Sequence, residues 1–213
     1  KDMGPAQWQL LARTISEEVS RKDVSGVVVT HGTDTLEEVA LFLHLTLSTD
    51  KPIVLTGSMR PATALSPDGP ANLFHAVQVC ASANASGRGV MVVMNSEILP
   101  ALHVVKRHSI ATNAFTSSPA GPLGRVYSGR TFFFSDSTKA ALAGAFGGAL
   151  SNDVALPAVD IHYVAAGNSH ADLLSRDWTE RSGLVIAGFG CGEIPDGLVP
   201  EINRLADDGI TIV

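Results

Sequence analysis

Short apolar runs rich in valine and isoleucine alternate along this chain with segments in which apolar residues recur every three or four positions. Runs of β-branched residues favour buried strands, whereas the second spacing is typical of amphipathic helices. We predict strands over residues 27–30, 53–56, 90–94, 160–164, 184–187 and 210–213, with shorter candidates at 125–127 and 131–134. We predict helices over residues 5–19, 36–47, 71–81 and 198–206, and one more from about residue 171 with Ser169 as its cap.

The alternation of strands and helices predicts an α/β protein. It indicates a doubly wound, mostly parallel sheet of the flavodoxin or Rossmann type, in three layers, followed by part of a smaller α/β domain. An Ala- and Gly-rich stretch separates the two patterns and is typical of a linker. We therefore expect an incomplete N-terminal domain over residues 1–135, a linker over 136–155 and an incomplete C-terminal α/β domain over 156–213.

Composition narrows the function classes. The chain has 213 residues, a net charge of -6 and no cluster of Lys and Arg, so we expect no nucleic-acid partner. No apolar run approaches the roughly 20 residues of a membrane span, so we expect no membrane partner. Cys80 and Cys191 form no CxxC pair, and His103 and His108 lack a third ligand at a recognisable spacing, so we predict no metal site.

The segment from Val27 to Glu38, VVVTHGTDTLEE, places polar residues between a predicted strand and a predicted helix. Thr35 and Glu38 form a capping-box pattern at the helix start, so Thr33 and Asp34 fall in the connecting turn. Ligands bind at this edge of open α/β sheets, and a hydroxyl and a carboxylate near helix N–H groups suit an anionic or amide substrate. Taken alone, the same residues also fit an ordinary turn with an Asx or Ser/Thr cap.

Two further polar clusters follow predicted strands. Residues 57–60 contain Ser58, and a later loop contains His103, Lys106, Arg107 and His108. Because the carboxyl ends of parallel strands meet at one edge, we expect the three clusters to converge if their strands are neighbours.

A lysine beside a threonine hydroxyl and an aspartate can form a catalytic unit. The hydroxyl needs a base, and a lysine becomes one when burial lowers its pKa, whereas a neighbouring carboxylate favours the ammonium form. Taken singly, Lys106 fits a solvated surface charge, Asp34 a cap and Ser58 a turn residue. His31 fits packing within its turn, and we do not assign it as a base.

The glycine-rich run GFGCG at residues 188–192 follows a predicted strand and precedes a predicted helix. A dinucleotide-binding loop has this setting, but its spacing is GxGxxG. We therefore interpret the run as a close backbone turn and predict no cofactor.

Two long motifs, HGTDTLEE at residues 31–38 and TGSMRPATALSPDGPANL at residues 56–73, carry a specific resemblance. Together with KPIVLTG, GVMVVMNSEI and GPLGRVYSGR, in this order, they resemble the bacterial-type L-asparaginases of the asparaginase/glutaminase family. The resemblance runs from end to end and is weakest over residues 131–155. Its details are more similar to the exported, high-affinity branch than to the cytoplasmic one, which predicts a periplasmic or secreted protein.

The resemblance implies a set of site residues. Thr33, Asp34 and Lys106 match the family's Thr-Lys-Asp triad. Gly32 and Asp34 match residues that hold the amino-acid end of the substrate, with Asp34 binding its α-amino group. Ser58 matches the position whose backbone carbonyl meets the side-chain amide.

The chain also departs from the family pattern. Relatives begin with a TGGTIA-like strand whose threonine is taken as the acylated nucleophile, and neither this motif nor the family's last elements occur here, so we expect an internal fragment. Glu193 stands where relatives often carry an Asn or Ser that reaches the substrate. A carboxylate there either repels the substrate's α-carboxylate or pairs with its ammonium group, with opposite effects on substrate preference.

The resemblance implies hydrolysis of the side-chain amide of L-asparagine to the acid and ammonia through a threonine acyl-enzyme, with L-glutamine left open as a second substrate. The nucleophile is either an N-terminal threonine outside this chain or Thr33, and the backbone N–H groups of Gly32 and Thr33 are candidates for an oxyanion hole. Two alternatives stay open: an ammonia-supplying amidase subunit, and a non-catalytic amino-acid-binding fragment on the same scaffold.

The partners that the resemblance implies are an amino-acid amide substrate and further copies of the chain, in a homotetramer or a dimer of dimers. A sheet that lacks a central strand exposes unpaired backbone groups. We therefore expect an isolated chain of 213 residues to aggregate.

Overall fold

The computed structural model describes residues 3–135, 140–150, 155–167, 173 and 175–213. The chain forms two compact units, Lys1–Val154 and Ala155–Val213. The limits of the two domains and the linker predicted from the sequence stay a prediction.

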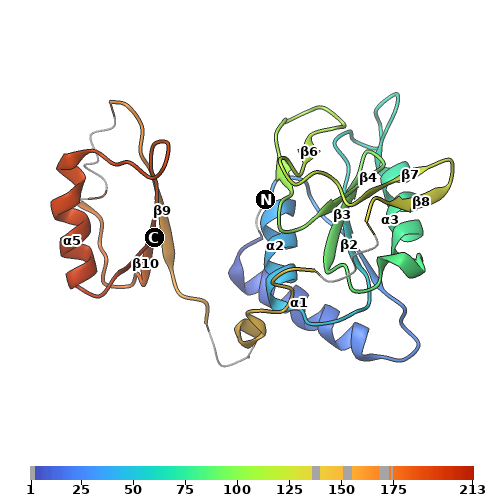
Figure 1. Cartoon of the computed structure of the whole chain (residues 1–213), viewed down its shortest axis with the longest axis horizontal. Coiled ribbons are helices and arrows are strands. Elements are labelled where there is room, and N and C mark those ends of the chain that lie inside the picture. The colour runs from blue at the N-terminus through green and yellow to red at the C-terminus, as the bar shows by residue number, and fades with distance from the viewer. Residues whose placement is uncertain (1–2, 136–139, 151–154, 168–172, 174) are drawn as a thin grey trace. The chain divides into compact units, whose positions relative to one another are not determined.

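The first unit is built on a six-stranded sheet with the strand order β1-β2-β3-β4-β7-β8 (Figure 1). Its strands are β1 (Val27–Thr30), β2 (Ile53–Thr56), β3 (Val90–Met94), β4 (Glu97–Pro100), β7 (Gly124–Tyr127) and β8 (Arg130–Phe133). Strands β1, β2 and β3 are parallel, whereas β4, β7 and β8 extend the sheet in antiparallel pairs. The predicted α/β fold is confirmed.

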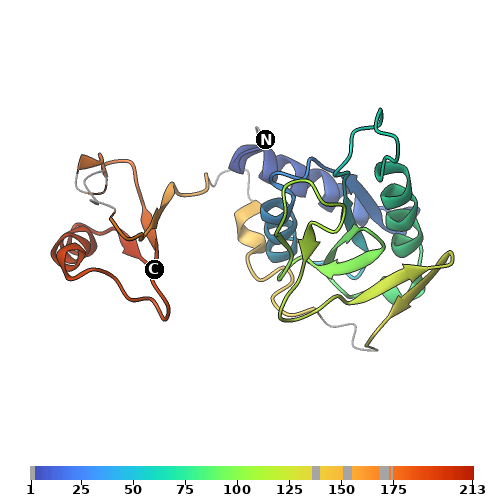
Figure 2. The same ribbon diagram turned by 90° about the horizontal axis from the view of Figure 1, so that it is seen from above.

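Helices cover both faces of this sheet, as Figures 1 and 2 show. Helices α1 (Pro5–Ser20) and α2 (Leu36–Thr46) lie on one face, and α3 (Gly69–Cys80) lies on the other. Because side chains alternate along a strand, Ile53 and Leu55 join the core beneath α1 and α2 while Val54 joins the core beneath α3. Strands buried on both sides explain the continuous apolar runs of the sequence.

Two tight hairpins account for the antiparallel half of the sheet. The β3–β4 turn consists of Asn95 (φ 48°) and Ser96 (φ 65°), and the β7–β8 turn consists of Ser128 (φ 48°) and Gly129 (φ 70°). Two successive residues with positive φ match the twist of the flanking strands and return the chain at once. The Asn-Ser pair is a weaker turn signal than Asn-Gly, and the sequence interpretation accordingly missed β4.

The predicted capping box at the start of α2 is wrong. Thr35 is the N-cap residue, but its side chain makes no capping hydrogen bond. Its ψ of 17° departs from the extended conformation in which a capping hydroxyl reaches the N–H of the third helical residue.

The Ala- and Gly-rich segment 140–150, inside the predicted linker, packs on the first unit. The side chain of Gln9 donates to the Ala149 carbonyl at 2.8 Å, and the Phe146 N–H donates to the Leu45 carbonyl at 2.8 Å. Its final turn, Gly147–Leu150, contacts both α1 and α2. This part of the segment therefore belongs to the first unit.

The described part of the second unit contains a three-stranded parallel sheet with the order β11-β10-β9, and the helix α5 (Val199–Asp207). Its strands are β9 (Val159–Tyr163), β10 (Gly183–Ala187) and β11 (Thr211–Ile212). The buried side chains of Leu184, Leu198 and Leu205 form the centre of its core. The predicted helix start near residue 171 and its cap Ser169 lie outside the described residues.

Replacement of Leu55 by alanine tests the core of the first unit. Leu55 is 0% exposed in β2, so we expect Leu55→Ala to lower the free energy of unfolding by about 2–5 kcal/mol. Urea denaturation measures the change. The matched control is Leu65→Ala at a fully exposed leucine, which we expect to stay within about 0.5 kcal/mol of the parent. Equal effects of the two substitutions would contradict the burial of Leu55 in this core.

Candidate active site

The turns after β1 and β2 lie side by side at one edge of the sheet. Thr30 and Thr56, the last residues of the two strands, are paired in register. The His31 N–H donates to the Thr56 carbonyl at 2.8 Å, which continues the pairing into the turn. The two turns therefore begin side by side at the carboxyl ends of the strands. One turn contains Gly32 to Asp34, and the other contains Gly57 and Ser58.

The structure brings together Thr33, Asp34 and Lys106. Lys106 Nζ donates to Thr33 Oγ1 at 2.9 Å and to Asp34 Oδ1 at 3.2 Å. The lysine side chain is 17% exposed, whereas the aspartate side chain is 69% exposed. The amine of a largely buried lysine side chain thus lies between a hydroxyl and a solvated carboxylate. The chemical roles of the three residues stay predictions.

Lys106 is carried by a two-stranded ribbon outside the main sheet. Strand β5 (Val105–Lys106) pairs antiparallel with β6 (Phe115–Thr116), which is anchored by the buried Phe115. Phe115 joins the same core cluster as α1 and α2. The ribbon therefore packs against the same core as helices α1 and α2.

One residue of the site was missed in the sequence interpretation. Glu37, in the first turn of α2, accepts a hydrogen bond from the backbone N–H of Lys106. The only signal in the sequence was an acidic residue at a helix start, which is common for reasons of the helix dipole alone. Nothing local connects it with a residue 69 positions away.

A carboxylate and an amide fix the loop after β2. Asp68 accepts the backbone N–H groups of Met59 and Arg60 at 3.0 and 2.9 Å. The side chain of Asn72, which is 2% exposed, donates to the Gly57 carbonyl and to Asp68, both at 3.0 Å. These bonds determine the path of the Ser58 loop.

Hydrogen bonds set the charge state of Asp68. Partial burial raises the pKa of this carboxyl, but the N–H groups of Met59 and Arg60 and the amide of Asn72 outweigh it and hold the pKa below its ordinary value. The carboxylate form is therefore the one that holds the loop.

Two shallow pockets border the turn. One of about 390 Å³ is lined by residues that include Gly32, Gly57 and Ser58. The other, of about 330 Å³, is lined by residues that include Asp34 and Lys106. The predicted substrate-binding residues of the first unit thus line these two pockets.

The remaining polar residues highlighted by the sequence lie elsewhere or have structural partners. Glu193 belongs to the second unit, where it is exposed and its carbonyl accepts the Phe189 N–H at 2.8 Å, so its contact with substrate stays a prediction. His108 Nδ1 accepts the N–H groups of the two residues at 110 and 111, at 3.1 and 3.0 Å. His31 Nδ1 lies 2.7 Å from the Gly32 carbonyl oxygen.

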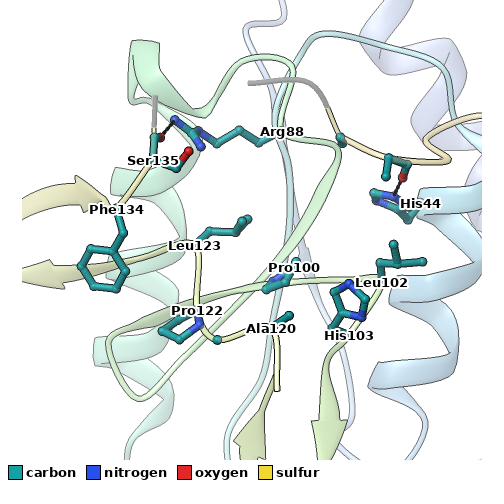
Figure 3. A pocket seen from close by; sticks show the side chains of 13 residues that line it. His44, Arg88, Pro100, Leu102, His103, Ala120, Pro122, Leu123, Phe134 and Ser135 are labelled. Atoms are coloured by element: carbon teal, nitrogen blue, oxygen red, sulfur yellow. Dashed lines mark hydrogen bonds between the residues drawn. The ribbon is translucent and has the colours of Figure 1, made fainter. Parts of the chain in front are cut away.

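Metal-ligating side chains do not gather in the described part of the chain. No group of three or more His, Cys, Asp or Glu residues there could hold a metal ion. His103 instead borders a separate pocket of about 340 Å³ beside the amino end of β3, together with the buried side chains of His44 and Arg88 (Figure 3). His44 Nε2 hydrogen-bonds the Ala141 carbonyl at 2.8 Å, so this histidine already serves to hold segment 140–150.

The family description "Asparaginase, N-terminal" matches residues 1–139, which include Thr33, Asp34 and Lys106. The chain belongs to the asparaginase family. The resemblance stated from the sequence motifs is thereby confirmed.

Several proteins are similar to this asparaginase-family chain. A glutaminase-asparaginase of Pseudomonas fluorescens biotype A is 41% identical over 204 residues, which cover 95% of this chain and 56% of the relative. A probable periplasmic L-asparaginase of Haemophilus influenzae is 37% identical over 214 residues, covering 100% of this chain and 60% of the relative. The chain spans less than two thirds of the length of these relatives.

Solved structures show the same fold. The crystal structure of a probable cytoplasmic L-asparaginase from Campylobacter jejuni superimposes with a TM-score of 0.89 at 39% identity, covering 99% of this chain and 69% of that one. Because this relative is named cytoplasmic and the one from Haemophilus influenzae periplasmic, the predicted exported localisation stays a prediction. Among the described residues, no helix is long and apolar enough to span a membrane.

Replacement of Gly57 by alanine tests the close approach of the two turns. A Cβ at Gly57 would lie 2.5 Å from the His31 carbonyl oxygen and 3.2 Å from Thr33 Cγ2. We expect Gly57→Ala to lower the free energy of unfolding of the protein by about 1–3 kcal/mol, because one of the two backbone segments must move. Gly32→Ala is the matched control, since a Cβ there meets nothing within 4 Å. Thermal unfolding compares the two, and equal losses of stability would contradict the described approach.

The carboxylate of Asp68 predicts a pH dependence. Its lowered pKa means that its contribution to stability is fully present above the pKa of the unfolded state and is lost as the pH falls through the folded-state pKa. We expect Asp68→Asn to lower stability at about pH 6, and the difference from the parent to shrink towards about pH 3, below the ordinary aspartate pKa. Urea midpoints measured across this range, with Asp50→Asn at an exposed carboxyl as control, test this. A difference independent of pH would contradict it.

Proposed function

We propose that this chain is part of an amidohydrolase that converts L-asparagine to L-aspartate and ammonia. The observation that carries the proposal is the 2.9 Å contact between Lys106 Nζ and Thr33 Oγ1, with Asp34 as the second partner of the lysine. A base must lie within hydrogen-bond reach of the proton that it moves, and this distance meets that condition. The names of the relatives, glutaminase-asparaginase and L-asparaginase, support the same reaction class.

In the proposed mechanism Lys106, in its neutral form, accepts the proton of the Thr33 hydroxyl. The Asp34 carboxylate, 3.2 Å from the lysine nitrogen, orients the amine. The hydrogen bond observed between Nζ and Oγ1 joins the two atoms between which this proton moves.

The substrate is held by residues on both sides of Thr33. Asp34 binds the α-amino group, Gly32 contacts the amino-acid end, and the backbone carbonyl of Ser58 accepts a hydrogen bond from the side-chain amide. Backbone N–H groups of Gly32 and Thr33 stabilise the oxyanion, an effect that reaches about 3–4 kcal/mol per donor in other hydrolases. The two pockets, one lined by Gly32 and Ser58 and the other by Asp34 and Lys106, provide the space for this substrate.

The reaction proceeds through a threonine ester. The threonine oxygen attacks the amide carbon, the C–N bond breaks, and the nitrogen leaves as ammonia with the transferred proton. Water then attacks the ester carbon, which releases aspartate and returns the proton to the threonine. Thr33 is one candidate for the attacking threonine. If another threonine attacks, Thr33 and Lys106 together activate the attacking hydroxyl or water.

Replacement of Lys106 by methionine tests the proposal in the full-length protein. We expect Lys106→Met to lower the rate of ammonia release from L-asparagine at least about 100-fold, because general-base catalysis contributes about 100- to 10,000-fold. Circular dichroism checks that the fold is kept. Lys22→Met, at an exposed lysine of the same unit, is the matched control and should leave the rate unchanged.

The outcomes distinguish the proposal from its alternatives. Full activity of Lys106→Met would overturn the proposed role of the lysine. Binding of L-asparagine by the parent protein without release of ammonia would favour a binding protein on the same scaffold. Parallel assays with L-glutamine measure whether the longer amide is also a substrate.

A further inference from the structure

The backbone N–H of Lys106 points away from the partner strand of its ribbon. In the β5–β6 ribbon Val105 is opposite Thr116 and Lys106 is opposite Phe115, and the Arg107 N–H donates to the Ala114 carbonyl at 2.7 Å. Antiparallel pairs alternate between those that exchange hydrogen bonds and those that do not. The bond from Arg107 to Ala114 marks their pair as a hydrogen-bonded one. The neighbouring pair, Lys106 with Phe115, is therefore not hydrogen-bonded, and the Lys106 N–H points away from β6.

The carboxylate of Glu37 is the partner of this outward N–H. Both residues are half-buried, so an unpaired N–H at this place would be costly. A carboxylate acceptor also makes the bond stronger than a neutral one. The bond therefore joins the backbone of β5 to the first turn of α2.

The same helix start fixes the other partners of the lysine. Thr33 and Asp34 precede Thr35, the N-cap residue of α2, so their positions follow from where the helix begins. The start of α2 thus positions both the ribbon that carries Lys106 and the turn that carries Thr33 and Asp34. The distance between Lys106 Nζ and Thr33 Oγ1 depends on Glu37 through the backbone of the lysine.

We propose that Glu37 is a positioning residue, whose carboxylate holds the backbone of Lys106 so that the lysine amine reaches the Thr33 hydroxyl. The inference rests on the proposed function, because the reach of the amine matters only if Lys106 moves a proton. Glu37 acts through the lysine and need not touch the substrate.

Three substitutions in the full-length protein separate reach from charge. Glu37→Ala removes the acceptor, Glu37→Gln keeps an acceptor oxygen at the same reach without the charge, and Glu37→Asp keeps the charge but withdraws it by one methylene. Glu38→Ala is the matched control, since Glu38 is exposed in the same helical turn. The kcat and KM for L-asparagine are measured for each variant, beside Lys106→Met.

The expected order of kcat is parent, then Glu37→Gln, then Glu37→Asp, then Glu37→Ala. The loss for alanine should be about 10- to 100-fold, since a displacement of about 1 Å in a catalytic group can cost about 100-fold. KM should change less than about threefold, because substrate binding uses other groups. Glu38→Ala should match the parent, and a crystal structure of Glu37→Ala should show Lys106 Nζ displaced from Thr33 Oγ1.

Other results overturn the inference. An aspartate variant more active than the glutamine variant would mean that charge and not reach matters. A kcat for folded Glu37→Ala equal to that of Glu38→Ala would mean that the bond is merely structural. If Glu37→Ala does not fold, the order of the glutamine and aspartate variants decides. If Lys106→Met loses activity and the Glu37 variants keep theirs, this inference is wrong and the proposed function is unaffected. If Lys106→Met is active, the proposed function itself is wrong.

Discussion

The in-register parallel pairing of β1 with β2 is the constraint from which the site follows. Thr30 is opposite Thr56, and the His31 N–H extends the pairing one residue past the strand end. Two turns must therefore start next to each other. They approach so closely that a methyl group at Gly57 would clash with the His31 carbonyl oxygen. Backbone hydrogen bonds, which depend little on side-chain identity, thus position the threonine and aspartate.

Carboxylates that accept backbone N–H groups hold the segments around these turns. Asp68 binds two N–H groups of the loop after β2, and Glu37 binds one on β5. Charge-assisted hydrogen bonds are about twice as strong as neutral ones, so a few of them can fix irregular segments that lack strand or helix pairing. Two carboxylates thus hold backbone segments, whereas a third, Asp34, contacts the lysine side chain.

The unequal exposure of Lys106 and Asp34 matters for the proposed chemistry. Here the amine is largely withdrawn from water while its carboxylate partner remains solvated. The carboxylate therefore orients the amine, which in the proposed mechanism accepts the proton of the Thr33 hydroxyl and later returns it.

The sequence by itself determined the α/β class, the elements of the sheet from β1 to β3 and the identity of Thr33, Asp34 and Lys106 as candidates, because periodicity and motifs are local properties of the chain. It did not reveal β4, whose hairpin depends on two positive φ values, nor the absence of a side-chain cap at Thr35. Only the tertiary structure decided that Lys106 meets Thr33, 73 positions away, and that Glu37 holds the backbone of that lysine. Both contacts arise because an isolated ribbon is packed against the start of a helix, and the energy of such packing depends on surfaces that no segment of the sequence contains alone.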